Sequence, residues 1–394
     1  MTVDLAPLGW LLLKAALIAA IPLALVLFSR QGDKPRRLAW LTAFLTLDLI
    51  VFGAFTRLTD SGLGCPDWPG CYGHSNPLSA GESIRAAESA LPSGPVTLTK
   101  AWIEMLHRYF AMAVGALILA LVAHAWWRRK NGSATSAWPA SIALAAVCVQ
   151  GAFGALTVTS KLQPLIVSLH LLGGMGLLAL LVWLAQRESP ASVVDASAAR
   201  LRPWLFVSLF LLVVQIALGG WVSSNYAVLA CAGFPTCQGS WWPEADFARG
   251  FTLWRELGRD GSGELIPFAA LVAIHWVHRV FALLVVSALA VLVWRAWRIQ
   301  GLEKPARGVL ALLVLQVATG VSNVVMQWPL ASALLHNGGA AALLAVLVLI
   351  LTRCAQAARD SRFALEAGSM KRAGSLPRAS ASARLEESFI GHRP

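Results

Sequence analysis

The chain has 394 residues, of which 57% are hydrophobic and only 13% are charged. Soluble globular domains carry roughly 25% charged residues, so this composition excludes most soluble folds. In a soluble protein the net charge of +12 would suggest a nucleic-acid partner, so the positions of the positive residues decide what it means. The 17 Trp residues are typical of a protein that meets membrane interfaces.

The apolar residues form runs of about 20, each long enough for a helix that crosses roughly 30 Å of hydrocarbon. The first run lacks a small-residue cleavage site and is interpreted as a retained helix, whereas cleavage as a signal peptide would leave eight spans. The predicted membrane spans are 8–28, 38–58, 101–127, 138–159, 164–186, 203–223, 268–294, 307–327 and 330–352.

Most of the 32 Lys and Arg residues lie in one set of connections and in the segment after residue 352. The positive-inside rule makes that side cytoplasmic, so the long loops 59–100 and 224–267 face outward. The N-terminus is then outside and the C-terminus inside. The segment 353–394 is expected to be disordered or to contact anionic lipid head groups. This distribution explains the charge without nucleic acid.

An internal repeat relates the two halves of the chain at an offset of 166 residues. Segment 53–71 aligns with 219–237, and His107 matches His278 once a longer second loop is allowed for. Four spans separate equivalent points, so the repeat is parallel. The prediction is an all-α polytopic membrane protein with two tandem four-helix bundles related by internal duplication, 38–190 and 191–352. An extra N-terminal transmembrane helix lies in 1–37.

Histidines inside the predicted spans are the strongest candidates for a functional site. A buried imidazole is costly unless it is paired or liganded, and for any single one a hydrogen bond to a neighbouring helix is the ordinary interpretation. Four of the five, however, form repeat-related pairs on the second and fourth helices of each bundle. Such pairs suit bis-imidazole haem ligation, whereas zinc would need further ligands. The five are His107, His170, His275, His278 and His336.

The residues beside the two histidine pairs are alike at one position and different at another. Arg108 and Arg279 each follow a histidine and either neutralise haem propionates or extend to the interface. Glu104 lies on the face of His107 and is either a water-exposed loop-end residue or a proton-handling group beside the haem. The matching residue in the second half is His275, so the two haem environments differ.

The outer loops carry two cysteine pairs, and one acidic residue lies in the middle of a span. An oxidising outer compartment favours a local disulfide in each loop, while a four-thiolate metal site and redox activity remain alternatives. Asp48 is expected to face the bundle interior. The cysteine pairs are Cys65 with Cys71 and Cys231 with Cys237.

Several motifs together resemble haem A synthase, the haem O oxygenase of cytochrome oxidase assembly, over roughly residues 38–352. They are GAFTRLTDSGLGCPDWPGC at 53–71, WIEMLHR at 102–108, the 219–243 run and the His336 helix. The paired cysteines resemble the proteobacterial form. The helix at 8–28 departs from the family core, and His275 lies one turn from His278, which leaves open which of the two binds iron.

The resemblance implies conversion of the C8 methyl group of haem O to a formyl group by two hydroxylations. His107 and His170 would then hold the substrate haem, His278 and His336 would ligate a resident haem b, and Glu104 would be the acidic residue beside the substrate. Expected partners are haem O synthase (protohaem farnesyltransferase), cytochrome oxidase assembly factors and a quinone or other membrane electron partner. Homo-oligomerisation stays open.

Two other classes of protein share the histidine pattern. One is a di-haem electron-transfer cytochrome that does not modify haem, and the other is a haem or small-molecule transporter built on the same repeat. Haem extraction separates the synthase from the cytochrome, since only a synthase makes haem A appear. A transporter would lack a stable low-spin haem spectrum.

Overall fold

The computed structural model describes residues 6–30, 33–133, 135–189 and 194–374, with side chains of the last helix described to residue 359. Every named element in these residues is a helix, and nine helices are long and apolar enough to cross a membrane. The predicted all-α polytopic class is therefore confirmed. The nine are α1 (Ala6–Leu27), α2 (Lys34–Leu58), α4 (Leu98–Lys130), α5 (Trp138–Thr159), α6 (Pro164–Arg187), α7 (Arg202–Ser224), α9 (Phe268–Ala296), α10 (Glu303–Val325) and α11 (Leu330–Gly374).

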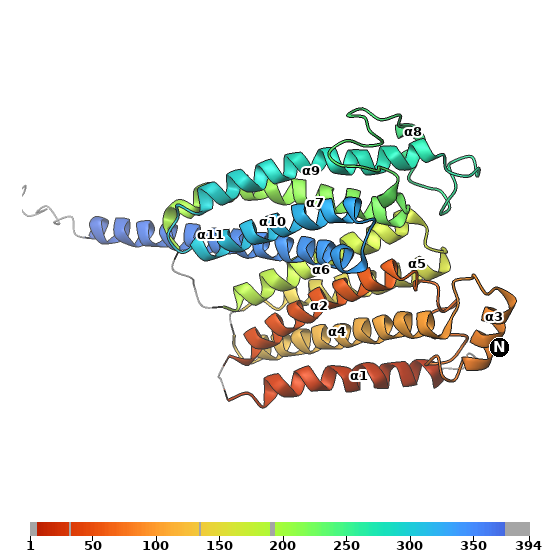
Figure 1. The fold of residues 1–394 in the computed structure, drawn as a ribbon. Coiled ribbons are helices and arrows are strands. Elements are labelled where there is room, and N and C mark those ends of the chain that lie inside the picture. Colours follow the sequence, from red (N-terminus) through yellow and green to blue (C-terminus); the bar gives the residue numbers. More distant parts are fainter. Residues whose placement is uncertain (1–5, 31–32, 134, 190–193, 375–394) are drawn as a thin grey trace, which may run out of the picture.

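Shorter elements lie in the connections. Helix α3 (Gly81–Ala90) lies in the first long loop, α8 (Phe247–Gly250) and the 3-10 turn η2 (Ala227–Leu229) lie in the second, and η1 (Ala196–Leu201) precedes α7. The long loops gather at one end of the molecule (Figure 1). We call this end the loop end.

Local sequence explains where several helices begin. Proline occupies the first turn of α2, α5, α6 and α7, where its missing N–H leaves no helical hydrogen bond unmade. At the loop end the Thr97 side chain caps α4 by accepting from Lys100 N, and Gln163 caps α6 by accepting from Ile166 N. These caps fix the starts of two helices that carry candidate histidines.

The membrane helices form two groups of four. In the first, α2 contacts α4 and α6, and α5 contacts the same two helices, while in the second α7 and α10 each contact α9 and α11. The groups meet where α6 and α2 lie against α11 and where α6 lies against α7. Helix α1 lies outside the first group on α4 (Figure 1). This arrangement agrees with two tandem four-helix bundles plus an extra helix.

Helices on the diagonals of each group lie farther apart than neighbouring helices. Within the described residues no Cα atom of α4 lies within 8 Å of one in α6, and the same holds for α9 and α11. These are the helices that carry His107, His170, His278 and His336. The space between each diagonal pair is therefore filled by side chains or is available to a planar group.

The backbone repeats specific conformations at the offset found in the sequence. All the non-glycine residues with positive φ among the described residues form four pairs separated by 166 positions. An internal duplication is the prediction that accounts for these correspondences. The pairs are Asp60 with Tyr226, Tyr72 with Gln238, Lys161 with Gln327, and Leu162 with Trp328.

Equivalent ends of the two halves contact each other directly. Arg57 Nη2 donates to Ser223 O at 2.5 Å, and the Tyr226 hydroxyl donates to Asp60 Oδ1 at 2.7 Å, with each pair 166 residues apart. The Arg57 guanidinium also lies 3.9 Å from the centre of the Tyr226 ring. The loop-end termini of α2 and α7 are thus joined by polar and cation–π contacts.

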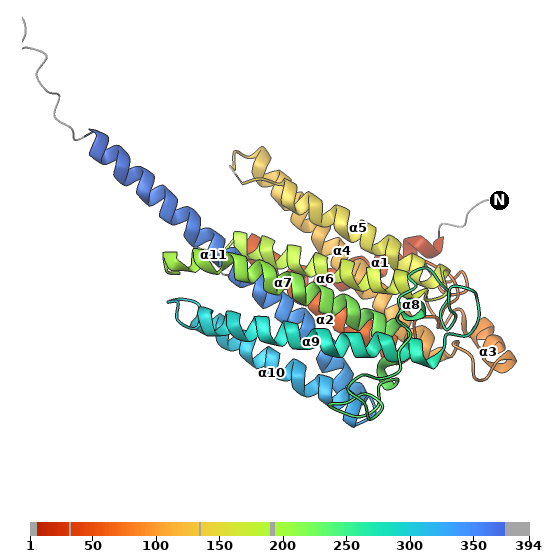
Figure 2. The same cartoon turned by 90° about the horizontal axis from the view of Figure 1, so that it is seen from above.

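Two expectations from the sequence are corrected. Helix α11 continues to Gly374 and projects beyond the other helices (Figure 2), so disorder from residue 353 is wrong as far as Gly374, and 375–394 lie outside the described residues. The helical periodicity continues because no proline or glycine interrupts the chain between 352 and 367. Asp48 is exposed because the buried face of α2 runs through Thr42, Ala43 and Thr46, away from Asp48.

Candidate functional site

The four paired histidines lie at matching depth near the loop end. Helices α4, α6, α9 and α11 all begin there, and each histidine lies within about three turns of its helix start. His107 is close enough to His170, and His278 to His336, for the imidazoles to interact electrostatically. Each pair therefore lies between the diagonal helices of its bundle, which is the placement that ligation of one macrocycle by two imidazoles would need.

Each of these imidazoles lies against a glycine of a neighbouring helix. A Cβ atom built on that glycine would come within 3.0–3.3 Å of the ring's Cε1 atom, which is tighter than ordinary contact. Glycine thus provides the space that the ring occupies. The four contacts are Gly53 with His107, Gly154 with His170, Gly219 with His278, and Gly320 with His336.

Glutamine side chains fix the backbone of three of the four histidines. Gln150 Nε2 donates to His170 O at 2.7 Å, and its repeat equivalent Gln316 donates to His336 O at 3.0 Å. Gln215 Nε2 donates to His278 O at 3.1 Å. A carbonyl on a histidine helix is thereby tied to the adjacent helix, so the ring's position does not depend on side-chain packing alone.

The ring nitrogens test whether haem fits these positions. His107 Nδ1 and His170 Nδ1 are buried without a hydrogen-bond partner in the described residues. A neutral imidazole carries its proton on one nitrogen and leaves the other unprotonated, so a ring with its proton on Nδ1 presents Nε2 to a metal ion. With an apolar bundle around them and glycine beside each ring, the residues present fit a bis-histidine haem in each half.

Glu104 joins α4 to the first outer loop. Its carboxylate is buried, with Oε2 accepting from Cys65 N at 2.8 Å and Oε1 accepting from Arg108 Nη2 at 2.5 Å. Of the two sequence-based readings, exposure to water is therefore wrong. The carboxylate lies on the helix that carries His107, one turn nearer the loop end.

Arg108 is occupied by the same loop. Its Nη1 donates to Asp67 O at 2.9 Å and to Gly70 O at 2.5 Å, while the guanidinium stays buried. The structure thus gives Arg108 loop carbonyls and Glu104 as partners, neither of which was expected from the sequence. A buried guanidinium with all these partners holds the loop over the first bundle. We call this set of arginine contacts the arginine bracket.

The second half builds the same bracket without a carboxylate. Arg279 donates to Gly233 O at 2.8 Å and to Cys231 O, and its Nε donates to His275 Nε2 at 3.3 Å. His275 is buried and takes the place that Glu104 has in the first half. Because its Nε2 is engaged by Arg279, the geometry favours His278 over His275 as the partner of His336.

Both outer-loop cysteine pairs are joined, as the sequence favoured. The disulfides Cys65–Cys71 and Cys231–Cys237 are buried beneath their loops. Their sulfur atoms are used within each pair, which removes the basis for the four-thiolate alternative. Each disulfide lies beside its arginine bracket, so loop, bracket and histidine helix form one unit in each half.

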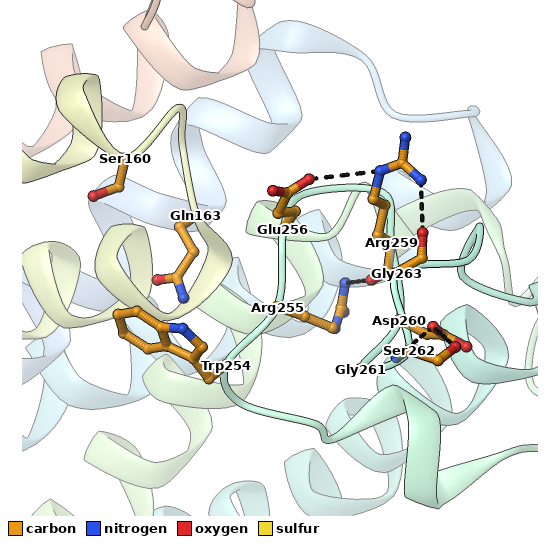
Figure 3. A pocket seen from close by; sticks show the side chains of 10 residues that line it. All are labelled: Ser160, Gln163, Trp254, Arg255, Glu256, Arg259, Asp260, Gly261, Ser262 and Gly263. Carbon is orange, nitrogen blue, oxygen red and sulfur yellow. Dashed lines mark hydrogen bonds and ion pairs between the residues drawn. The ribbon is translucent and has the colours of Figure 1, made fainter.

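A separate recess of about 660 Å³ lies between the α5–α6 turn and the second outer loop (Figure 3). Its charges are largely satisfied inside the loop, because Arg259 pairs with Glu256 at 3.5 Å and Arg255 Nη1 donates to Arg259 O at 2.8 Å. Burial lowers the pKa of Arg255, and the Ser262 hydroxyl holds the pKa of Asp260 below its ordinary value. None of the sequence-predicted site residues lines this recess.

Fold and site together define a polytopic helical membrane protein with two histidine pairs, each held between diagonal helices near one membrane face. The family model described as cytochrome oxidase assembly protein (COX15-CtaA) matches residues 36–348. The chain belongs to this family. The match begins after α1, which agrees with the prediction that the first helix lies outside the family core.

Individual relatives carry the printed name "Heme A synthase". The protein of Shewanella oneidensis is 43% identical over 322 residues, covering 80% of this chain and 96% of that protein. The protein of Rhizorhabdus wittichii is 30% identical over 340 residues, covering 80% and 94%. A more distant match from Shouchella clausii is 30% identical and covers 65% and 82%.

Replacing Gly53 with Ala should displace the His107 ring, because the added Cβ would lie 3.0 Å from Cε1. Overpacking of this kind costs about 1–3 kcal/mol, so we expect bound haem in the purified protein to fall severalfold. The matched control is Gly115→Ala on α4, where nothing lies within 4 Å of the new atom. Equal haem absorbance in the two variants would contradict the assigned contact.

Proposed function

We propose that the chain is a haem A synthase, which oxidises the C8 methyl group of haem O to the formyl group of haem A. The observation that carries this proposal is the family match over 36–348 in a chain whose paired histidines face each other between diagonal helices. A relative with the printed name "Heme A synthase" shares 43% of residues over most of both chains, which supports the reaction.

In this proposal the two histidine pairs have different tasks. His107 and His170 hold the substrate haem in the first bundle, and His278 and His336 ligate a haem b in the second. A bound haem supplies the electron-transfer chemistry that side chains lack. The protein's own contribution is to hold each ring nitrogen in place, to surround the macrocycle with apolar helices and to cover the loop end.

Glu104 is proposed to act beside the substrate haem. It lies one turn from His107, and its contact with Cys65 N closes the first outer loop over that end of the bundle. Its ion pair with Arg108 offsets part of the cost of burying a carboxylate charge. Glu104 therefore combines two tasks, positioning the loop and placing a negative charge near the methyl group that is oxidised.

Sidedness follows from charge. The basic connections lie at the end opposite the long loops, which supports a cytoplasmic C-terminus and outer loops in the periplasm of a bacterial inner membrane. Buried disulfides in those loops agree with an oxidising compartment. Haem O synthase, cytochrome oxidase assembly factors and a quinone or other membrane electron partner are the expected partners.

Haem extraction tests the reaction. Cells that make haem O but no haem A should accumulate haem A when this chain is expressed, as measured by acid-acetone extraction and chromatography. A variant with His107→Ala should bind haem b and yet give no haem A, since only the substrate site is changed. Haem A output identical with and without the chain would exclude the synthase and leave the di-haem cytochrome.

Two substitutions at Glu104 separate its tasks. Glu104→Gln keeps an oxygen that can accept from Cys65 N but loses the charge opposite Arg108, whereas Glu104→Ala loses both. We expect haem b to stay bound in both variants and haem O or a hydroxylated intermediate to accumulate in both. If Glu104→Gln makes haem A at the normal rate, the charge has no role and only loop positioning remains.

A reporter fused after Pro394 tests the orientation. Green fluorescent protein folds in the cytoplasm and not when exported unfolded to the periplasm, so a C-terminal fusion should fluoresce. Alkaline phosphatase inserted after Gly94, in the first long loop, should be active because that enzyme needs the oxidising side. The reverse pattern would invert the proposed topology.

A further inference from the structure

The Nδ1 atoms of the four paired histidines have different surroundings in the two halves. In the second half, His336 Nδ1 lies 3.0 Å from Thr319 Oγ1, and His278 Nδ1 lies 3.2 Å from Gln215 Nε2. In the first half, both Nδ1 atoms are buried and have no hydrogen-bond partner among the described residues. The two sites thus differ in what holds their rings, although the glycine contacts are the same.

The two halves differ in sequence at the repeat-related positions beside the histidines. At the offset of 166 residues, Thr319 corresponds to Phe153 and Gln215 corresponds to Leu49. The flanking glycines Gly154 and Gly320 match each other, so the helices hold the rings in equivalent places. Two polar residues of the second half therefore stand where the first half has apolar ones.

The contacts of Thr319 determine which nitrogen of His336 carries the proton. The Thr319 hydroxyl donates its only hydrogen to Leu315 O at 2.7 Å, so towards His336 it presents a lone pair. His336 Nδ1 must then be the donor, which leaves Nε2 unprotonated. An unprotonated Nε2 is the form that binds a metal ion, so Thr319 prepares His336 as a ligand before any haem arrives.

Gln215 holds His278 at two points. Its amide nitrogen lies 3.1 Å from His278 O, 3.2 Å from Nδ1 and 3.4 Å from Nε2, and so bridges backbone and ring from the facing helix α7. Its Oε1 is buried without a partner. A half-turn of the amide would release the bond to His278 O and bring Oε1 to Nδ1, where it would accept the Nδ1 proton and leave Nε2 of His278 free for iron.

We propose that Thr319 and Gln215 are positioning residues that make the second-half pair a retentive haem site, and that Leu49 and Phe153 keep the first-half pair exchangeable. This inference rests on the proposed function, in which one haem stays and the other must leave as product. Hydrogen bonds to Nδ1 fix ring orientation and increase the basicity of the ligand. A ring without such a bond is oriented only by its backbone and by packing, and it releases iron more readily.

Haem transfer from the purified full-length chain tests the proposal. In a His170→Ala background, which disables the first-half pair, the loss of haem b to excess apomyoglobin reports on the second half alone. Adding Thr319→Val should accelerate this loss by about 10- to 100-fold, the usual effect of removing a partner of a metal-bound histidine. The reduction potential of the haem should rise, because the ligand becomes less basic.

Control variants separate positioning from folding. Ser322→Ala removes another hydroxyl of α10, which contacts Met326 and not a histidine. This variant should leave the rate of haem transfer and the reduction potential unchanged. Thr319→Ser keeps the hydroxyl and should restore slow transfer. If Thr319→Val does not fold, Gln215→Leu is the second probe. The proposal is overturned if Thr319→Val and Gln215→Leu both show the transfer rate and the reduction potential of Ser322→Ala.

The first half offers the reciprocal test. Leu49→Gln gives His107 the residue that His278 has, at nearly constant volume, and should slow haem loss from the first-half pair in a His336→Ala background. Unchanged loss would also count against the proposal. The two proposals can fail separately. If extraction shows no haem A while the rate of haem transfer still depends on Thr319, the synthase function is rejected and the role of Thr319 is kept.

Discussion

The structure depends on the need to hold imidazole rings inside an apolar bundle. Such a ring needs space and a fixed direction, and the protein provides these separately. Space comes from a glycine on the adjacent helix, as between Gly53 and His107. Direction comes from glutamines that tie the histidine backbone to a neighbouring helix, as in Gln150 to His170 O. The paired rings lie on diagonal helices, whose Cα atoms stay more than 8 Å apart within the described residues, and under the proposed function the space between these helices takes the haem.

The two long loops are an extension of the same helices. Arg108 and Arg279 each lie one residue after a paired histidine and reach loop carbonyls beside a disulfide. A change that moves such a loop therefore pulls on the helix turn that carries the ring. The halves differ in what balances the arginine, since Glu104 supplies a carboxylate and His275 supplies a neutral nitrogen acceptor. The chemistry of the two sites diverges at this position within a common framework.

The sequence predicted the parts of the fold that depend on period and composition. The nine spans, the loop end and the four paired histidines follow from apolar runs, charge placement and the repeat, because each is a pattern over many residues. Contacts of single side chains were not predictable in this way. The engagement of Arg108 with Gly70 O depends on a loop conformation, and the exposure of Asp48 depends on which face of α2 meets its neighbours. Thr319 was missed because a threonine in a membrane helix ordinarily bonds its own backbone, as it also does here.

The seam between the halves places the two sites in a definite relation. Equivalent residues of the repeat meet there, Arg57 with Ser223 and Asp60 with Tyr226, and helices α6 and α11 lie directly against each other. These two helices carry His170 and His336, so each bundle presents one of its paired histidines on the helix nearest the other bundle. In an enzyme that oxidises one haem with the help of another, electrons have to cross between the bundles. Under the proposed function, the packing of α6 on α11 gives electrons a path through two adjoining helices that each carry one of the paired histidines.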